Sequence, residues 1–562
     1  MRSSSLFIVL QRMRKPFLVL ITTYTIAITG LLLIDGFDDA GKPYQMTIFD
    51  AFYFVTYTAT TIGFGETPYE FTYAQRIWVS ILIYITVLGW FYAIGTLVSL
   101  LQDKVFNREL QKAKFKRQVK SIKQKFIIIL GYNQITSEII NRAISQGIRA
   151  VVIEKDEAKA NEAILENFTP TVPVLVADAH SAWAIEFAGI KSKYCKGLVS
   201  IFDNDSLNLR IALTSKLLNP YVKLVVKSTT QNHTDNLKDL DVEIIANPFS
   251  IISSEILMAL SAPNILKLEK WVYQIEHLNS SLPLFPKGKY IICGFGRMGQ
   301  HIYKRFKYLE IETQFVEIDK DKTINFIEDE EIQIAYGNAD DKKLLQNVGI
   351  DEAVAIIAAT NDDTTNLSVL ATAKKLNPKI MTIARENEMD DFSIFKSAKI
   401  DHIFMPARIL INKTTNALIN PLSDKFIRLA TSQDDMWASK LVKELTLKIN
   451  ENPLLIELKI DKKETPTIYD NLFKENITIK LLSKSLYNRE LHNNMIPLLL
   501  HRNNEYILLP SLDEKLQKND SLLLACDENA KNDIEYIIQN IYEFHYALTG
   551  EEKKTFILRK NK

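Results

Sequence analysis

The chain has 562 residues, of which 68 are basic and 67 acidic, and this balance gives no argument for nucleic-acid binding. A single hydrophobic core stops growing at about 250–300 residues, so the length predicts several domains. The three cysteines, Cys195, Cys293 and Cys526, are widely spaced and form neither a metal-binding pattern nor a disulfide framework.

Two apolar runs, 17–34 and 77–101, are each long enough to cross a hydrocarbon core of about 30 Å. A short aromatic-rich run, 49–60, lies between them and is predicted to enter the membrane as a helix and return. Basic residues flank the pair of runs, whereas the segment between them carries acidic residues such as Asp35, Asp38 and Glu66. By the positive-inside rule, both chain ends are predicted to be cytoplasmic.

The segment after the short run reads Thr60-Thr61-Ile62-Gly63-Phe64-Gly65-Glu66. Irregular backbone at membrane depth is tolerated only where it is buried in protein or lines a water-filled path. Glycine permits the unusual dihedrals that point successive carbonyls at one axis, and rings of carbonyls replace the hydration shell of K⁺. The segment resembles the selectivity filter of potassium channels, which implies the filter residues Thr61, Ile62, Gly63, Phe64 and Gly65. Two departures from the commonest filter are Phe64 for tyrosine, which removes a bracing hydroxyl, and Glu66 for aspartate.

The second apolar run contains Gly89 and Gly95, each of which serves either close helix packing or bending. A charged, helix-prone stretch, 103–125, is predicted to be the linker that leaves the membrane.

Two similar halves follow, with Gly131 of the first aligned with Gly294 of the second and Glu154 aligned with Asp319. Each half alternates short apolar strands with helical stretches, which predicts βαβ units and a parallel sheet. After the second half, short alternating runs over 441–529 indicate a small α+β subdomain.

The second half contains Gly294-Phe295-Gly296-Arg297-Met298-Gly299 between a strand and a helix, the context that the dinucleotide fingerprint requires. The helix N-terminus offers amides to phosphates. Asp319, 20 residues beyond Gly299, is predicted to bind the ribose hydroxyls, and Arg297 and Arg385 are the candidate phosphate partners.

The first half keeps only the first glycine of this motif, in Gly131-Tyr132-Asn133-Gln134-Ile135-Thr136. Asn133 tolerates positive φ, so the turn and a nucleotide site with Glu154 remain one alternative, although Thr136 would crowd the helix against the strand. Asp178, Asp203 and Asp205 lie near the predicted strand ends and are candidates for a site for Ca²⁺; they are equally interpretable as loop residues or caps.

Both halves resemble the RCK family, the ligand-sensing domains that regulate potassium conductance. The motifs are Gly294–Gly299, Asp319, Gly337-Asn338-Ala339, Thr360-Asn361-Asp362 and Arg385. The resemblance implies that Asn338, Ala339, Thr360 and Asn361 contribute to the nucleotide site. It also implies four subunits around one pore, with eight RCK domains in a gating ring.

The predicted architecture is therefore a two-span α-helical pore domain (1–102), a linker (103–125), and two tandem Rossmann-like α/β RCK domains (126–286 and 287–562), the second including the subdomain. We expect a prokaryotic inner-membrane potassium channel, a homotetramer gated by NAD or ADP and by Ca²⁺, that is not an enzyme. The alternatives are a membrane-tethered NAD-dependent oxidoreductase and a regulatory subunit of a potassium-uptake system.

Overall fold

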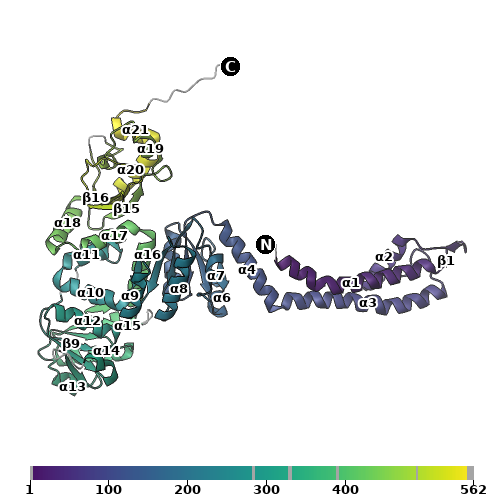
Figure 1. Cartoon of the computed structure of the whole chain (residues 1–562), viewed down its shortest axis with the longest axis horizontal. Coiled ribbons are helices and arrows are strands. Elements are labelled where there is room, and N and C mark those ends of the chain that lie inside the picture. Colours follow the sequence, from purple (N-terminus) through teal and green to yellow (C-terminus); the bar gives the residue numbers. More distant parts are fainter. Residues whose placement is uncertain (1–3, 282–284, 327–331, 388–391, 489–490, 554–562) are drawn as a thin grey trace, which may run out of the picture. The chain divides into compact units, whose positions relative to one another are not determined.

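The computed structural model describes residues 4–281, 285–326, 332–387, 392–488 and 491–553. The chain forms two compact units, Met1–Ser121 and Ile122–Lys562. The first unit is drawn in purple and blue in Figure 1, and the second runs from blue through green to yellow.

The first unit is built from two long apolar helices with a short helix between them. Its elements are α1 (Ser4–Leu33), β1 (Gly36–Phe37), β2 (Pro43–Tyr44), α2 (Ile48–Ala59), α3 (Tyr73–Gln102) and α4 (Lys104–Ser121). The segments Met13–Leu33 and Tyr73–Gln102 are long and apolar enough to cross a membrane. Helix α2 begins at a capping box formed by Thr47 and Asp50, which fixes where the short helix starts.

Helices α1 and α3 pack closely where glycine removes a side chain. A Cβ atom added to Gly89 would lie 3.1 Å from Thr23 Oγ1 on α1, so Gly89 permits the close approach of the two helices. A Cβ atom added to Gly95 would meet no described atom of the chain within 4 Å. The structure therefore assigns Gly89 a packing role and leaves bending open for Gly95.

The first half of the second unit is a six-stranded parallel sheet with the order β5-β4-β3-β6-β7-β8. Every residue of Phe126–Leu130 is buried, as expected for a central strand that is covered on both faces. The strands are β3 (Phe126–Leu130), β4 (Arg149–Glu154), β5 (Val174–Val176), β6 (Cys195–Ser200), β7 (Lys223–Lys227) and β8 (Ile244–Ala246). The helices are α5 (Gln134–Ser145), α6 (Glu157–Leu165), α7 (Ala182–Phe187), α8 (Asp205–Leu218) and α9 (Gln231–Asp239).

The second half repeats this topology with the order β11-β10-β9-β12-β13-β14, which confirms the predicted duplication of a Rossmann-like fold. Its strands are β9 (Tyr290–Cys293), β10 (Thr313–Glu317), β11 (Gln333–Tyr336), β12 (Ala355–Ala358), β13 (Met381–Arg385) and β14 (His402–Phe404). Its helices are α12 (Arg297–Tyr308), η1 (Lys320–Phe326), α13 (Lys342–Asn347), α14 (Asp363–Leu376) and α15 (Phe392–Ser397).

The two halves exchange the helix that follows their sixth strand. Helix α10 (Pro248–Ser261) leaves the first half and packs on α12 of the second, where Phe249 and Ile252 join the core around Ile302. Helix α16 (Pro406–Ile419) leaves the second half and packs on α5 of the first. Each half therefore completes the core of the other.

The last part of the chain is an antiparallel sheet of order β15-β18-β16-β17 with a core on each face. Along β18, Leu522 and Leu524 enter one core and Leu523 and Ala525 the other, which is the alternation of a strand covered on both sides. The elements are α17 (Pro421–Ala430), α18 (Asp435–Lys448), β15 (Leu454–Lys459), α19 (Pro466–Asn471), η3 (Ile479–Ser483), β16 (Met495–Arg502), β17 (Glu505–Leu508), β18 (Ser521–Cys526), α20 (Glu528–Gln539) and α21 (Ile541–Thr549).

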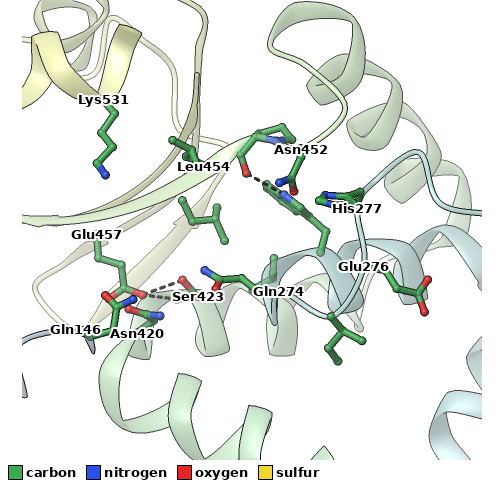
Figure 2. A pocket seen from close by; sticks show the side chains of 15 residues that line it. Gln146, Gln274, Glu276, His277, Asn420, Ser423, Asn452, Leu454, Glu457 and Lys531 are labelled. Carbon is green, nitrogen blue, oxygen red and sulfur yellow. Dashed lines mark hydrogen bonds between the residues drawn. The ribbon is translucent and has the colours of Figure 1, made fainter. Parts of the chain in front are cut away.

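Helix α11 (Pro263–Val272) joins this last part to the first half, because its Trp271 packs among the residues of the sheet's second core. A cavity of about 460 Å³ lies at this junction (Figure 2). Glu457 on its wall accepts hydrogen bonds from the backbone and hydroxyl of Ser423, and burial raises the pKa of its carboxyl. None of the site residues predicted from the sequence lines this cavity.

Candidate ion path and nucleotide site

The predicted filter follows directly on the C-terminus of α2. Thr61, Gly63 and Gly65 have φ angles of 62°, 66° and 102°, so the backbone alternates into the left-handed region. The amides of Ile62 and Gly63 donate to the carbonyl of Tyr57, at 2.8 and 3.3 Å, which ties the start of the segment to the helix. Glycine at the second and third of these positions avoids the strain that a Cβ atom would bring.

A tyrosine on α2 braces this segment from behind. The hydroxyl of Tyr57 donates to the carbonyl of Gly65 at 2.6 Å and lies 2.8 Å from Thr67 Oγ1. The sequence led us to expect that Phe64 removes the bracing hydroxyl. The structure supplies one from α2 instead, and the ring of Tyr57 also contacts the edge of Phe64.

Glu66 holds the C-terminal end of the segment. Its carboxylate accepts from Nε and a terminal nitrogen of Arg76, at 2.8 and 3.0 Å, and from the amide of Phe71 at 2.7 Å. The hydrogen bond from Arg76 is the main reason that the pKa of this carboxyl lies below its usual value. The longer glutamate therefore reaches an arginine on the first turn of α3.

The glycine-rich loop of the second half leaves the start of α12 open. Gly294 has a φ of 106°, and a Cβ atom on Gly299 would lie 2.2 Å from the Gly294 carbonyl oxygen. Gly296 is the N-cap of α12, makes no side-chain capping bond, and has open space where its Cβ would be. In the described part of the chain no side chain caps the first amides of α12, as an anion-binding helix N-terminus requires.

In the first half the equivalent helix end, at the start of α5, is capped by a side chain. Asn133 has a φ of −161°, and its side chain accepts from the Thr136 amide at 2.9 Å, so Asn133 does not adopt the left-handed conformation that the sequence allowed. Thr136 does not push the helix away, because it is buried and its hydroxyl bonds to Asn133. The hydroxyls of Tyr132 and Ser137 are also bonded to Glu166.

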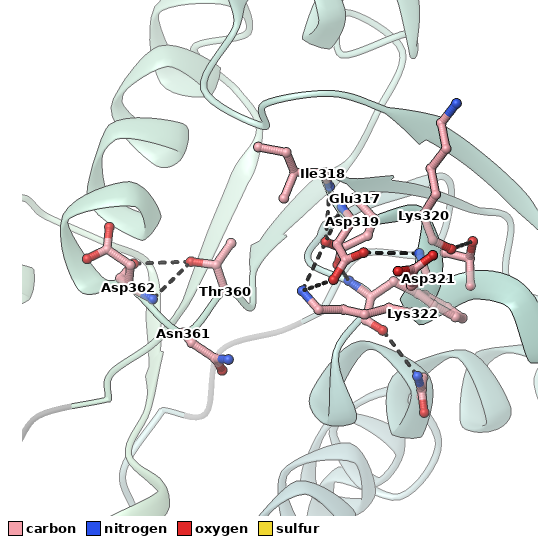
Figure 3. Close-up of polar contacts among 12 residues, drawn as sticks. Glu317, Ile318, Asp319, Lys320, Asp321, Lys322, Thr360, Asn361 and Asp362 are labelled. Atoms are coloured by element: carbon pink, nitrogen blue, oxygen red, sulfur yellow. Dashed lines mark hydrogen bonds and ion pairs between the residues drawn. The ribbon is translucent and has the colours of Figure 1, made fainter.

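The strand-end carboxylates show that the sequence alignment of Glu154 with Asp319 is shifted by two residues. Glu154 Oε2 accepts from the Tyr132 amide at 2.6 Å, and Glu317 Oε2 accepts from the Phe295 amide at the same distance. Glu317, which is 4% exposed, is therefore the counterpart of Glu154. Asp319 is half exposed and caps the amide of Asp321 at the start of η1 (Figure 3).

The other predicted residues of the second half lie at neighbouring strand ends. Thr360 and Asn361 follow β12, and Figure 3 shows them on the other side of the site from Glu317. The Thr360 hydroxyl donates to Asn366 at 2.7 Å, so its role here is to order the loop. Asn338 and Ala339 follow β11, where Asn338 is exposed and Ala339 is buried.

Two arginines at this site pack against the same aromatic ring, which comes from the other half of the unit. The guanidinium carbons of Arg297 and Arg385 lie 4.9 and 5.0 Å from the centre of the Phe249 ring, which belongs to α10. Arg297 also donates to the hydroxyl of Thr229 at 2.9 Å, and Arg385 donates to Asn361 at 3.1 Å. The sequence did not indicate that Phe249 and Thr229 reach this site, because it carries no signal for the exchange of α10.

The positive charge of Arg385 lies in an unfavourable environment within this chain. Burial, with the charge of Arg297 as a second cause, lowers the pKa of Arg385 to about 10. Its Nε is buried and has no hydrogen-bond partner among the residues that the structure describes. The charge of Asp363 acts in the opposite direction and raises the pKa of Arg385, but among the described residues neither guanidinium forms an ion pair with a carboxylate within 4.0 Å. The site therefore combines a helix N-terminus, two arginines and a strand-end carboxylate, a set that suits the phosphates and ribose of a nucleotide.

The three carboxylates proposed for Ca²⁺ are not brought together. Asp178 pairs with His180 and Lys155, and Asp203 is exposed beside Lys227. Asp205 is buried and accepts from the amides and hydroxyls of Thr229 and Thr230. In the described part of the chain, no group of three or more His, Cys, Asp or Glu side chains is placed to hold a metal ion.

Comparisons with known families match both parts of the chain. Residues 17–103 match the ion channel family, and residues 127–248 and 290–406 each match the TrkA-N domain. Potassium channel protein 1 of Methanocaldococcus jannaschii is 26% identical over 258 residues, which are 46% of this chain and 73% of that protein. The chain is a potassium channel with two RCK domains.

Two solved structures are similar to this channel. A structure described as the GsuK channel has a TM-score of 0.50 at 14% identity and covers 98% of this chain and 100% of its own. A second, described as the GsuK channel bound to NAD, has a TM-score of 0.49 at 15% identity and covers 95% and 99%. The matches support a membrane channel, and neither the oxidoreductase nor the separate regulatory subunit that the sequence left as alternatives is better supported.

Proposed function

We propose that this channel is a homotetramer in which an adenine nucleotide, bound in the second RCK domain of each chain, sets the opening of a K⁺-selective pore. The observation that carries the nucleotide assignment is the uncapped N-terminus of α12 at Gly296, beside two arginines, Arg297 and Arg385, that form no close ion pair with a carboxylate in the described part of the chain. In the first domain the equivalent helix end is capped by Asn133. We therefore propose one nucleotide per chain.

The geometry suggests where each part of the nucleotide binds. The phosphates would accept from the amides at the start of α12 and from Arg297 and Arg385, because guanidinium groups pair well with phosphate oxygens. Glu317 Oε2 accepts one hydrogen bond, from the Phe295 amide, among the described residues, so it has capacity left for a ribose hydroxyl. NAD and ADP are the first ligands to test, since solved GsuK structures are described with each of them.

The pore itself is proposed to use the carbonyls of residues 61–64. Ile62 and Phe64 are 61% and 65% exposed in the single chain, which fits a segment that neighbouring subunits cover. One chain supplies one strand of carbonyls, so a closed cyclic assembly is needed to surround an ion. Four chains would bring eight RCK domains into a ring on the cytoplasmic side of a prokaryotic inner membrane, with both chain ends inside.

Coupling to the pore would follow the chain. The inner helix α3 continues after one residue into α4, which is followed by β3 of the first RCK domain. Shifting a pore from 1:99 to 99:1 open needs about 5.5 kcal/mol of differential binding, or roughly 1.4 kcal/mol from each of four sites. The divalent-cation site remains a prediction without support from the described residues.

Titration calorimetry of the purified channel with ADP and NAD tests the site. Gly296→Val is the sharpest variant, because Gly296 has a φ of −71° that any residue adopts and open space for a side chain. We expect a stoichiometry near one per chain, and at least tenfold weaker binding in Gly296→Val. Asn133→Ala in the first domain is the control and should leave the affinity unchanged. Equal affinity in wild type and Gly296→Val would refute the assignment.

A further inference from the structure

Two residues of the first RCK domain reach the proposed nucleotide site of the second. Phe249, on the first turn of α10, lies under both Arg297 and Arg385. Thr229, just after β7, accepts a hydrogen bond from Arg297 at 2.9 Å. Both residues are buried, with 4% and 6% of their surface exposed. These contacts join the two domains of one chain at the point where phosphates are expected.

Thr229 links Arg297 to a negative charge that does not touch it. The Thr229 hydroxyl accepts from Arg297 and itself donates to Asp205 Oδ2 at 3.1 Å. Hydrogen bonds in such a chain polarise one another, so the carboxylate strengthens the hold of the hydroxyl on the guanidinium. Asp205, considered from the sequence as a metal ligand, instead orders this corner of the first domain.

The hydrogen bonds from Arg297 to Thr229 and from Thr229 to Asp205 keep the charge of Arg297 close to that of Arg385. Without them, Arg297 would be free to turn away from Arg385 and relieve their repulsion. Held in place, the two guanidiniums form an anion site whose arrangement is already set before the ligand arrives. Preorganisation of this kind raises affinity, because less side-chain freedom is lost on binding.

We propose that Thr229 and Phe249 of the first RCK domain are part of the phosphate subsite of the second, so that a bound diphosphate locks the two domains together. This inference rests on the proposed nucleotide function and adds the route of its coupling. Thr229 and Phe249 belong to the domain that is joined through α4 to the inner helix. Ligand bound to the second domain therefore acts directly on the domain that is connected to the pore.

The chain offers a matched pair of threonines for the test. Thr229 and Thr230 both donate a hydroxyl hydrogen bond to Asp205, at 3.1 and 3.0 Å, but of the two only Thr229 accepts from Arg297. Calorimetry on the full-length channel should show ADP affinity weakened roughly threefold to tenfold in Thr229→Val, the loss of one hydrogen bond to a charged group. Thr230→Val should stay within about twofold of wild type, and Thr229→Ser should restore binding.

Two further measurements separate this role from a general loss of structure. Adenosine lacks phosphates, so its affinity should be the same in Thr229→Val and wild type. In an Arg297→Gln background, Thr229→Val should have no additional effect on ADP. Unchanged or tighter ADP binding in Thr229→Val, an equal loss for adenosine, or an effect that survives without Arg297 would overturn the inference alone. Failure of the wild-type channel to bind any adenine nucleotide would instead overturn the proposed function.

Discussion

In the segment that we propose as the filter, the hydroxyl of Tyr57 on α2 takes the place of the bracing hydroxyl that Phe64 lacks. Replacing Tyr57 with phenylalanine removes the donor to the Gly65 carbonyl at 2.6 Å and leaves the ring in place. A hydrogen bond of this kind contributes about 0.5–1.5 kcal/mol, so we expect a less stable filter with faster loss of current and a K⁺ preference over Na⁺ reduced severalfold. Single-channel recordings in bilayers measure both quantities.

Tyr53→Phe is the matched control for that experiment. Tyr53 lies one turn earlier on α2, its ring packs against Tyr57, and no hydrogen bond of its hydroxyl is present within the described chain. It should therefore conduct like wild type. A Tyr57→Phe channel with unchanged selectivity and current stability would show that the hydroxyl does not brace the filter.

Substitutions of Glu317 and Asp319 are predicted to affect nucleotide binding to different degrees. Glu317→Gln removes the strand-end charge and should weaken ADP binding by roughly 1–3 kcal/mol, whereas Asp319→Asn should change it by less than threefold, because Asp319 faces solvent at the start of η1. Calorimetry compares the two variants directly. Glu154→Gln, which perturbs the same loop contact in the first domain, controls for structural effects. A larger loss in Asp319→Asn would restore the assignment made from sequence.

The sequence predicted the glycine-rich turn before α12, and it paired Glu154 with Asp319, two residues beyond Glu317, which makes the equivalent contact. The spacing of Gly294, Gly296 and Gly299 needs only local backbone physics, and the structure shows the positive φ and the close approach that it implied. The choice between Glu317 and Asp319 depends on strand register. Val316 pairs with Cys293 as Ile153 pairs with Leu130, so Glu317 occupies the position of Glu154. The sequence does not show this, because an acidic residue also stands at 319.

At the scale of elements, both membrane spans, the short pore helix and both parallel sheets were predictable from hydrophobic pattern. The exchange of α10 and α16 was not, because both helices bury one apolar face and the sequence does not say which sheet receives it. For the same reason, the sequence of either half taken separately does not show that Phe249 and Thr229 contact the second half. Non-local packing therefore limits what could be read from this chain.

Substitution by alanine should have different effects on stability at Gly89 and at Gly95 of α3. A methyl group on Gly89 meets Thr23 Oγ1 at 3.1 Å, so Gly89→Ala should lower the melting temperature of the purified channel. Adding Thr23→Ala relieves the crowding and should restore it. Gly95→Ala has open space within the chain and gains up to about 1 kcal/mol of helix propensity, so it should not lower the melting temperature. A Gly89→Ala channel as stable as wild type would argue against the packing role.

For the whole molecule, the order of parts along the chain suggests how binding energy reaches the pore. The filter and inner helix precede the first RCK domain, which is joined to the second by exchanged helices and by the Arg297 contact. A ligand can shift the pore only by its differential affinity for the two gate states. A site variant that abolishes nucleotide binding must therefore also abolish the response of the pore to the nucleotide.

K⁺ flux from liposomes containing the purified channel tests this requirement most directly. We predict flux that favours K⁺ over Na⁺ and changes at least tenfold, in either direction, when ADP or NAD is added at the RCK side. Gly296→Val should conduct K⁺ and ignore both nucleotides. K⁺ flux that is indifferent to both nucleotides in the wild-type channel, or a full nucleotide response in Gly296→Val, would contradict the account.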